Sequence, residues 1–381
     1  MVLFCIKILK NPKKILIIIQ RSNGDVFLSI SLINELYKHY QSPQIDLLVN
    51  DDTYPLAKLL PNINFIHQFS YKKKRNKRWK QEKAIFTSIF KRYDLSINLT
   101  ASDRSVIYAL LAGKKTISAV ESENKKSWWK KILLTYHYFF DSEKHILLNN
   151  LEPLNCLKIN HSNTQKSVFL SNKIIDNVKK KLNKKGIKEF VIFHPSAQYK
   201  YKIYNQFLRD ELFTFLSSLG PSIVITGSNN KIDSEIKLNL PSLPNVFDFI
   251  SETTLEEYFA LSSLSLAYIG MDTLNMHIAA SQNKRIFAIF GPTNLSMWSP
   301  WSNQLELSAK DNMPIQTYGN VTIFQANMTC VACGKAGCDD NHGNSDCLDN
   351  INPKTIFNEI EDWYLNSSHK TEIPVATENG Q

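Results

Sequence analysis

Short apolar runs alternate with longer amphipathic stretches along most of the chain. In the first half, runs of strand length occupy residues 15–20, 45–50, 63–68 and 95–99, and residues 25–40 have a helical pattern. In the second half, EFVIFHP, PSIVITG, SLAYIG and RIFAIFGP are interleaved with helical patterns at residues 206–219, 231–238, 255–264 and 273–282. Apolar runs alternating with helices are typical of buried parallel strands. The pattern predicts an α/β fold with two Rossmann-like, doubly wound domains.

The chain divides near its middle. A length of 381 residues favours two domains over one core, and the polar stretch NHSNTQKS at residues 160–167 separates the two halves. We expect an N-terminal domain at 1–170 and a C-terminal domain at 171–350. A C-terminal helix at 351–366 and a disordered polar tail at 367–381 complete the prediction. Ligands of such domains bind at the carboxyl ends of the strands, so the cleft between the domains is the expected site.

The overall charge favours an anionic partner. The chain has 45 Lys and Arg against 35 Asp and Glu, a net charge of +10, which suits nucleic acid, an acidic membrane or a phosphorylated substrate. No apolar stretch has the length of a membrane span, and Lys7 and Lys10 interrupt the apolar N-terminus, which makes a poor signal peptide. We therefore expect a cytoplasmic protein.

A helix in the second half is suited to binding a phosphate. In YIGMDTLNMHIAAS, residues 268–281, a strand ends at Gly270, a turn follows at Asp272 and Thr273, and a helix begins. The free N–H groups of a helix N-terminus bind phosphate oxygens. The next strand ends in FGPT, residues 290–293, with another hydroxyl. Alternatively, Asp272 and Thr273 only cap the helix.

These motifs resemble the heptosyltransferases, glycosyltransferase family 9. The resemblance rests on Gly270-x-Asp272-Thr273-x-x-Met276-His277, on FGPT and Trp298, on FHPSAQYKYKIYNQF at 193–207 and on RSNGDVFLSISLINEL at 21–36. It implies an inverting, metal-independent GT-B enzyme that moves heptose from ADP-heptose to the lipopolysaccharide or lipooligosaccharide core. It also implies a peripheral position on the cytoplasmic side of the inner membrane. The chain departs from the family pattern at Ser31, Tyr204, Leu274 and Asn275; the Leu274 side chain limits the approach of a pyrophosphate.

The resemblance assigns donor-binding roles to residues at the strand ends of the C-terminal domain. Lys202 is expected to stabilise the leaving diphosphate and to act in catalysis. Glu252 suits either a ribose hydroxyl or the first turn of a helix, and His277 suits packing better than catalysis. The expected donor-binding residues are Ser196, Ala197, Gln198, Glu252, Asp272, Thr273, Leu274, His277, Gly291, Pro292 and Thr293.

A carboxylate follows a glycine at the first strand-to-helix turn, in RSNGDV. An anion-binding loop would avoid this charge, and there is no GxGxxG motif. In the resembled family this Asp is the proposed general base, so Asp25 is expected to project into the cleft and take the proton of the acceptor hydroxyl. Asn23 and Gly24 are expected to contact the acceptor. Alternatively, Asp25 caps the first helix.

A basic run, YKKKRNKRWKQEK at residues 71–83, holds eight Lys and Arg. We expect it to face a phosphorylated lipid A-core acceptor and the anionic membrane surface rather than nucleic acid, since no DNA-binding motif is present. A solvated loop is the other alternative. The segment 123–140, with Trp128 and Trp129, suits either an interfacial contact or a helix packed on the core. The expected acceptor-binding residues of the run are Lys72, Lys73, Lys74, Arg75 and Arg78.

Four cysteines form C-x₂-C-x₄-C-x₈-C at Cys330, Cys333, Cys338 and Cys347. The first spacing suits structural zinc, whereas the other gaps are less typical. Zinc, disulfides and free thiols all remain open, and no cofactor is expected to take part in catalysis.

Three other functions fit parts of the sequence. A GT-B transferase could use a different nucleotide sugar. A GT-B-shaped epimerase would release free sugar without an acceptor. A basic nucleic-acid-binding protein would bind duplex DNA with a steep dependence on salt.

Overall fold

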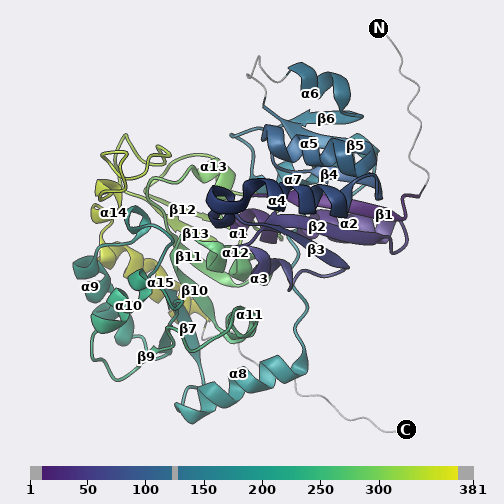
Figure 1. The fold of residues 1–381 in the computed structure, drawn as a ribbon. Coiled ribbons are helices and arrows are strands. Elements are labelled where there is room, and N and C mark those ends of the chain that lie inside the picture. The colour runs from purple at the N-terminus through teal and green to yellow at the C-terminus, as the bar shows by residue number, and fades with distance from the viewer. Residues whose placement is uncertain (1–10, 122–127, 368–381) are drawn as a thin grey trace, which may run out of the picture.

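The structure is a computed structural model that describes residues 11–121 and 128–367, except for the side chains of 73–78 and 367. It contains two parallel sheets in two lobes that face each other (Figure 1). This confirms the predicted α/β architecture. None of the helices in the described ranges combines the length and apolar character needed to span a bilayer.

The N-terminal sheet has six parallel strands in the order β3-β2-β1-β4-β5-β6. The strand order reverses beside β1, which is where doubly wound folds open a crevice. Successive β1 residues face opposite layers: Ile15 and Ile17 pack with α1, α2 and α7, whereas Leu16 and Ile18 pack with α4 and α5. The strands are β1 (Lys14–Ile19), β2 (Gln44–Asn50), β3 (Phe65–Phe69), β4 (Tyr93–Asn98), β5 (Gly113–Val120) and β6 (Tyr136–Phe139). The helices are α1 (Asn23–Phe27), α2 (Ile30–His39), α3 (Tyr54–Ala57), α4 (Tyr71–Ile89), α5 (Asp103–Ala112), α6 (Trp128–Leu133) and α7 (Ile146–Leu157).

The C-terminal sheet has the order β12-β13-β11-β10-β7-β8-β9, and only the edge strand β12 is antiparallel to its neighbour among the described strands. Its order reverses between β7 and β10. The strands are β7 (Phe190–His194), β8 (Ser222–Ile225), β9 (Val246–Asp248), β10 (Ala267–Met271), β11 (Arg285–Ile289), β12 (Ile315–Tyr318) and β13 (Val321–Phe324). The helices are α8 (Asn172–Lys184), α9 (Gln206–Ser217), α10 (Lys231–Leu238), α11 (Leu255–Leu264), α12 (Leu274–Ser281), α13 (Leu295–Trp298), α14 (Asp346–Asp349) and α15 (Pro353–Ser367).

Most of the predicted elements are present, with informative differences. The helix expected at residues 25–40 is two helices, α1 and α2, and the basic run is the helix α4 rather than a loop. The helix α15 lies where a C-terminal helix is predicted, while residues 368–381 of the expected disordered tail lie outside the described residues. The sequence did not reveal β5, β6, β9, β12 or β13. These strands are short or lie near a sheet edge, where the apolar pattern is weak.

The two lobes are packed against each other as well as joined by the chain. No helix or strand interrupts residues 159–171, between α7 and α8; this segment contains the predicted domain boundary at residue 170, which stays a prediction. His145 Nε2 donates to the Ser299 carbonyl at 2.9 Å, and Gln165 Nε2 donates to the His277 carbonyl at 2.8 Å. These buried contacts hold the carboxyl ends of the two sheets together.

Gly270 is required where β10 passes β7. Its φ is +153°, and a Cβ added there would lie 2.4 Å from the His194 carbonyl oxygen. Any side chain would force the two strands apart at the point where the strand order reverses.

Candidate functional site

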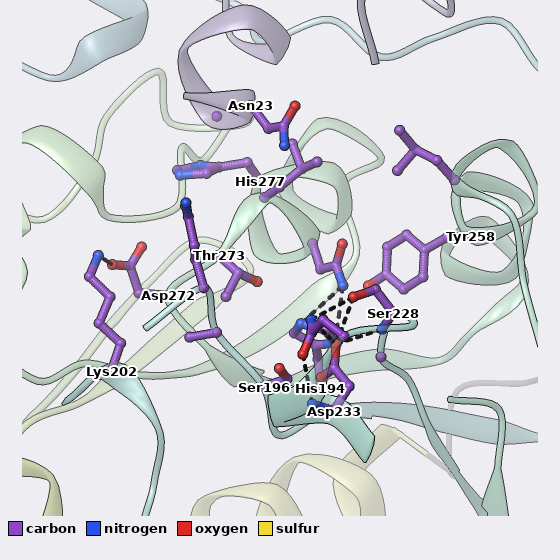
Figure 2. Close-up of a pocket in the computed structure, with 18 of the residues that line it drawn as sticks. Asn23, His194, Ser196, Lys202, Ser228, Asp233, Tyr258, Asp272, Thr273 and His277 are labelled. Atoms are coloured by element: carbon purple, nitrogen blue, oxygen red, sulfur yellow. Dashed lines mark hydrogen bonds and ion pairs between the residues drawn. The ribbon is translucent and has the colours of Figure 1, made fainter. Parts of the chain in front are cut away.

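A cavity of about 590 Å³ opens at the carboxyl ends of the strands. Its walls come from both lobes: the start of α1 contributes one wall, and the segments after β7, β8, β9 and β10, together with Trp298 of α13, contribute the rest. Figure 2 shows Asn23 of the N-terminal lobe across the cavity from Ser196 and His194 of the C-terminal lobe. The sequence-predicted residues in its lining are Asn23, Gly24, Ser196, Ala197, Gln198, Lys202, Asp272, Thr273, Leu274 and His277.

Lys202 and Asp272 form an ion pair at one side of this cavity. The Lys202 Nζ lies 3.2 Å from Asp272 Oδ2, and the Lys202 side chain is about a quarter exposed. Lys202 ends the 3₁₀ turn Lys200–Lys202 after β7, and Asp272 follows β10. The Lys202 ammonium therefore stays accessible to an anion in the cavity, and the Asp272 carboxylate holds it at the cavity wall.

The N-terminus of α12 also faces the cavity. Thr273 is the N-cap residue, but its side chain makes no capping hydrogen bond; its Oγ1 lies 3.5 Å from the Tyr268 hydroxyl. A helix start leaves its first backbone N–H groups without helical partners. The Thr273 hydroxyl and these N–H groups, with Lys202, form a positive region that suits a diphosphate.

Two histidines in the cavity wall are neutral. Burial lowers the pKa of His194 to about 4 and that of His277 to about 4. His194 Nδ1 lies 3.0 Å from Thr226 Oγ1 and from Asn275 Nδ2. His277 is buried, as expected for a packing residue, but its Nδ1 has no hydrogen-bond partner among the described residues.

The loop after β8 and the first turn of α10 form a polar corner of the cavity, made of Ser228, Asn230 and Asp233, which the sequence did not reveal. Asp233 is buried, and its Oδ2 accepts hydrogen bonds from Ser228 N at 2.7 Å and Asn230 Nδ2 at 2.6 Å. Asp233 Oδ1 is buried without a hydrogen bond. The carboxyl ends of neighbouring parallel strands meet at one edge of a sheet. The polar residues SNN at 228–230, directly after the strand PSIVITG, could therefore have indicated a contribution to the site. The other lining residues for which no role was predicted are His194, Tyr199, Gly227, Thr253, Thr254, Leu255, Tyr258, Asn275 and Trp298; Ser22, beside the predicted Asn23 and Gly24, also lines the cavity.

Asp25 does not project into the cavity, which corrects the expected orientation. Only 3% of the residue is exposed, and it is absent from the cavity lining although its neighbours Asn23 and Gly24 are present. Its Oδ2 accepts from Ser22 Oγ at 2.6 Å and Ser22 N at 3.2 Å, and its Oδ1 lies 3.0 Å from Arg21 Nε. These contacts turn the carboxylate back onto the start of α1, where Ser22 is the N-cap residue and Asp25 is the third residue of the helix.

The electrostatics of Asp25 still favour proton uptake. Burial raises the pKa of this carboxyl above its ordinary value, and the Arg21 guanidinium and the Ser22 hydrogen bonds lower it by less. Asp25 Oδ1 also lacks a hydrogen bond of good geometry despite its ion pair with Arg21. The raised pKa makes Asp25 a stronger base than an exposed aspartate, although Arg21 and Ser22 occupy its two oxygens in this structure.

Several predicted donor-binding residues lie outside the cavity lining. The Glu252 carboxylate pairs with Lys185 Nζ at 2.8 Å, so the structure places it against α8 rather than near a ribose. In the FGPT loop, the Gly291 and Pro292 carbonyls accept from Ala332 N at 3.3 Å and Gly334 N at 2.6 Å. These hydrogen bonds join the loop to the cysteine-containing segment. Thr293 is buried and also lies outside the lining.

The predicted acceptor-binding lysines and arginines lie at the start of α4. Lys72 is exposed. The side chains of Lys73, Lys74, Arg75 and Arg78 are outside the described residues, so their expected contacts with an acceptor stay predictions. The helix begins at the carboxyl end of β3, the same end of the sheet as the cavity.

The four cysteines of the C-terminal lobe are free thiols in this structure. Cys330, Cys333 and Cys338 are exposed and Cys347 is buried. Burial, and after it the nearby Cys338, Cys333 and Cys330, raises the pKa of Cys347 to about 11. Within residues 11–121 and 128–367, no three His, Cys, Asp or Glu side chains are arranged to hold one metal ion. Structural zinc stays a prediction.

Known proteins match the chain in both sequence and structure. The family model described as glycosyltransferase family 9 (heptosyltransferase) matches residues 83–325. The chain is 26% identical over 296 residues to lipopolysaccharide heptosyltransferase 3 of Escherichia coli, covering 75% of this chain and 85% of the relative. The match to the family model begins after Asp25, so it does not include the first strand-to-helix turn.

Two solved structures have the same fold. The structure of E. coli ADP-heptose LPS heptosyltransferase II has a TM-score of 0.68 and 19% identity, with 93% of this chain and 99% of that chain covered. E. coli heptosyltransferase WaaC with ADP-2-deoxy-2-fluoro heptose has a TM-score of 0.67 and 14% identity, with 92% and 99% covered. These similarities confirm the two-lobed GT-B architecture.

Proposed function

Because the chain belongs to glycosyltransferase family 9, the heptosyltransferases, we propose that it transfers heptose from ADP-heptose to a hydroxyl of a lipopolysaccharide or lipooligosaccharide core. The chain is a glycosyltransferase; the donor, the acceptor and the mechanism are the proposal. The observation that carries it is that Lys202, the start of α12 and the first turn of α1 all line the same cavity. It joins a site for a diphosphate to the turn that bears a basic carboxylate.

The C-terminal lobe binds the donor in this proposal. The diphosphate lies against Lys202, the Thr273 hydroxyl and the free N–H groups of α12, and the Ser196 hydroxyl lines the same region. Negative charge increases on the diphosphate as the bond to the sugar breaks. Preorganised donors at such a charge are worth several kcal/mol, so these groups favour the departure of ADP.

Asp25 acts as the general base in this proposal, and the displacement inverts the anomeric carbon. Its raised pKa suits proton uptake, and the acceptor hydroxyl reaches it by replacing the Ser22 hydroxyl on Oδ2 or by donating to Oδ1. General-base assistance contributes about 10²- to 10⁴-fold in rate. The buried orientation described above thus requires a local rearrangement when the acceptor binds.

The proposed mechanism needs no metal ion. Lys202 and the start of α12 provide positive charge where a metal would otherwise neutralise the diphosphate. The four cysteines lie on a segment that supports the FGPT loop from outside the cavity. They have no part in the chemical step.

The acceptor is a phosphorylated lipid A-core, so the enzyme works at the cytoplasmic surface of the inner membrane. Two observations support a membrane location: the net charge of +10 and the basic helix α4 at the cavity end of its sheet. Both suit an anionic lipid surface.

Purified protein incubated with ADP-heptose and a panel of truncated core lipids tests the proposal through ADP release. We expect release that depends on one acceptor of the panel and a product with inverted anomeric configuration. Release without acceptor would instead indicate hydrolysis or isomerisation of the donor. Turnover only with another nucleotide sugar would support a second candidate function, a GT-B transferase with a different donor. The observation that favours this candidate is the side chain of Leu274, which lines the cavity and limits the approach of a pyrophosphate.

A further inference from the structure

The outer face of α4 carries exposed aromatic and basic side chains in one stripe. Lys72, Trp79 and Phe86 are seven residues apart, and Lys83 and Phe90 continue the same side at helical spacing. Trp79 is 84% exposed, Phe86 38% and Phe90 40%. The opposite side of the helix packs Ile85 and Ile89 into the core. The exposed stripe is therefore not needed for the packing of the domain.

The helix α6 and strand β6 continue this surface. Trp128, Ile132 and Leu133 are 64%, 69% and 60% exposed, and Phe139 is 48% exposed. The other side of α6 packs its Trp129 against Val106 and Leu110 of α5. Figure 1 shows α4 and α5 over the N-terminal sheet and α6 beside its edge strand β6. We call the outward side of α4, α6 and β6 the outer aromatic face.

The charges on this face are basic, and its nearby acids are engaged by the protein. Lys91 Nζ lies 5.3 Å from the Phe90 ring centre, and Lys131 Nζ lies 5.0 Å from that of Phe139. Among the acids, Glu82 accepts a hydrogen bond from Tyr108, and the Asp103 carboxylate lies 2.7 Å from the buried Lys130. The face thus combines apolar side chains with unneutralised lysines.

We propose that the outer aromatic face docks on an anionic lipid bilayer, with Trp79 and Trp128 inserted at the headgroup level. Tryptophan prefers this interfacial region, and lysine beside apolar side chains is typical of interfacial helices. A second copy of the chain is a poor occupant, because it would bring two basic faces together. The inference rests on the proposed function only in that the acceptor lipid lies in the same bilayer.

The position of this face links docking to the cavity. The helices α4 and α5 begin directly after β3 and β4, at the carboxyl ends of the parallel strands. The cavity opens at that end of the sheet. A bilayer bound to the outer aromatic face therefore reaches the end of the sheet at which the cavity opens.

Sedimentation of the full-length protein with lipid vesicles tests this inference. We expect binding to phosphatidylcholine vesicles that contain phosphatidylglycerol, weak binding to phosphatidylcholine alone, and about tenfold weaker binding for the double variant Trp79→Ala/Trp128→Ala. Lys83→Glu/Lys131→Glu should weaken binding by at least about tenfold, since each basic residue near an anionic surface contributes about 1 kcal/mol. Circular dichroism confirms that each variant is folded.

Matched controls use residues exposed elsewhere. Phe169 and Phe207 are 88% and 76% exposed, and Lys179 and Lys180 are exposed on α8. Phe169→Ala/Phe207→Ala and Lys179→Glu/Lys180→Glu should bind vesicles as the wild type does. Equal losses in the control variants, equal binding of neutral and anionic vesicles, or no binding by the wild type would each overturn the inference. Tighter, salt-sensitive binding of duplex DNA through the same residues would also overturn it.

A second measurement separates this inference from the proposed function. ADP release with a lipid-free core oligosaccharide needs no membrane, so the tryptophan variants should match the wild type there and lose activity only with acceptor embedded in vesicles. Wild-type turnover without vesicle binding would refute docking and leave the transferase intact. Vesicle binding without turnover on any acceptor would refute the transferase alone, and an equal loss on both acceptors would count against a docking role.

Discussion

The guanidinium of Arg21 lies 3.0 Å from the carboxylate of Asp25, one helical turn along the chain. Arg21 also lies 4.8 Å from the ring centre of Phe140. Burial raises the pKa of Asp25, while Arg21 opposes that rise. The ion pair with Arg21 therefore limits the rise in the pKa of Asp25 and fixes the orientation of its side chain. A substitution at Asp25 can test whether its role is catalytic or structural.

Replacing Asp25 by Asn should remove activity without a loss of stability. The native pKa is above the ordinary 3.8, so the stability linked to this group is fully present below pH 3.8 and is lost as the pH rises through the native pKa. At pH 7 the buried charge opposes folding, and Asn relieves this cost. We expect a fall in kcat of about 10²-fold or more, unchanged ADP binding, and an equal or higher free energy of unfolding in urea.

The opposite pattern would identify Asp25 as a helix cap. Substitution of an N-terminal capping group costs about 1 kcal/mol, so a loss of that size with kcat retained would contradict the base. Loss of ADP binding with the fold intact would instead move Asp25 to the donor site.

Lys202→Ala should weaken donor binding and turnover together. The ammonium is the cation at the cavity side of the 3₁₀ turn, and a charge-assisted contact to a phosphate is worth about 1.5–3 kcal/mol. We expect about a tenfold or larger rise in the dissociation constant of ADP, measured by calorimetry, and a lower kcat. Lys200→Ala is the control, because Lys200 lies on the same turn and pairs with Glu235 away from the cavity. Equal effects of the two substitutions would remove Lys202 from the site.

Gly270→Ala should destabilise the C-terminal lobe. The new Cβ would lie 2.4 Å from the His194 carbonyl oxygen, in a backbone conformation that favours glycine. We expect a loss of at least about 2 kcal/mol in the free energy of unfolding, a value at the upper end of ordinary single substitutions. Urea unfolding monitored by tryptophan fluorescence measures it, and a loss below 0.5 kcal/mol, within the ordinary range for surface changes, would show that β10 moves freely away from β7.

The contact between the lobes should weaken in acid through His145. Its Nε2 donates to the Ser299 carbonyl and its Nδ1 accepts from Leu147 N at 3.2 Å, which is the neutral form. Burial and the nearby His277 lower its pKa to about 3. The stability that it contributes is present above pH 6.5, the ordinary value, and falls as the pH drops from 6.5 towards 3.

His145→Asn tests this pH dependence and keeps a residue type favoured at helix N-caps. Between pH 7 and 5 the wild type should lose stability with a steeper slope than the variant. The difference is at most about 1.4 kcal/mol per pH unit. Parallel slopes in urea titrations at each pH would contradict a neutral, buried His145.

Much of the fold and part of the site could be predicted from the sequence. The apolar runs marked β7, β8, β10 and β11 within two residues at most ends, because a buried strand needs apolar side chains on both faces. The rule that ligands meet strand ends then placed Lys202, Thr273 and Gly24 around one cavity. The polar corner at Asp233 also lies at a strand end, but its sequence has no distinctive motif, so it was not predicted.

What the sequence determined by itself was the alternation of strands and helices, the two-lobed architecture and the edge at which the cavity opens, since these depend on local periodicity and chain order. The tertiary structure decided the direction of individual side chains. Asp25 turns back to Ser22 and Arg21, Glu252 pairs with Lys185 and the Gly291 carbonyl accepts from Ala332. Such directions depend on charges and hydrogen-bond partners that folding brings together, often from distant parts of the chain, and local periodicity does not encode them.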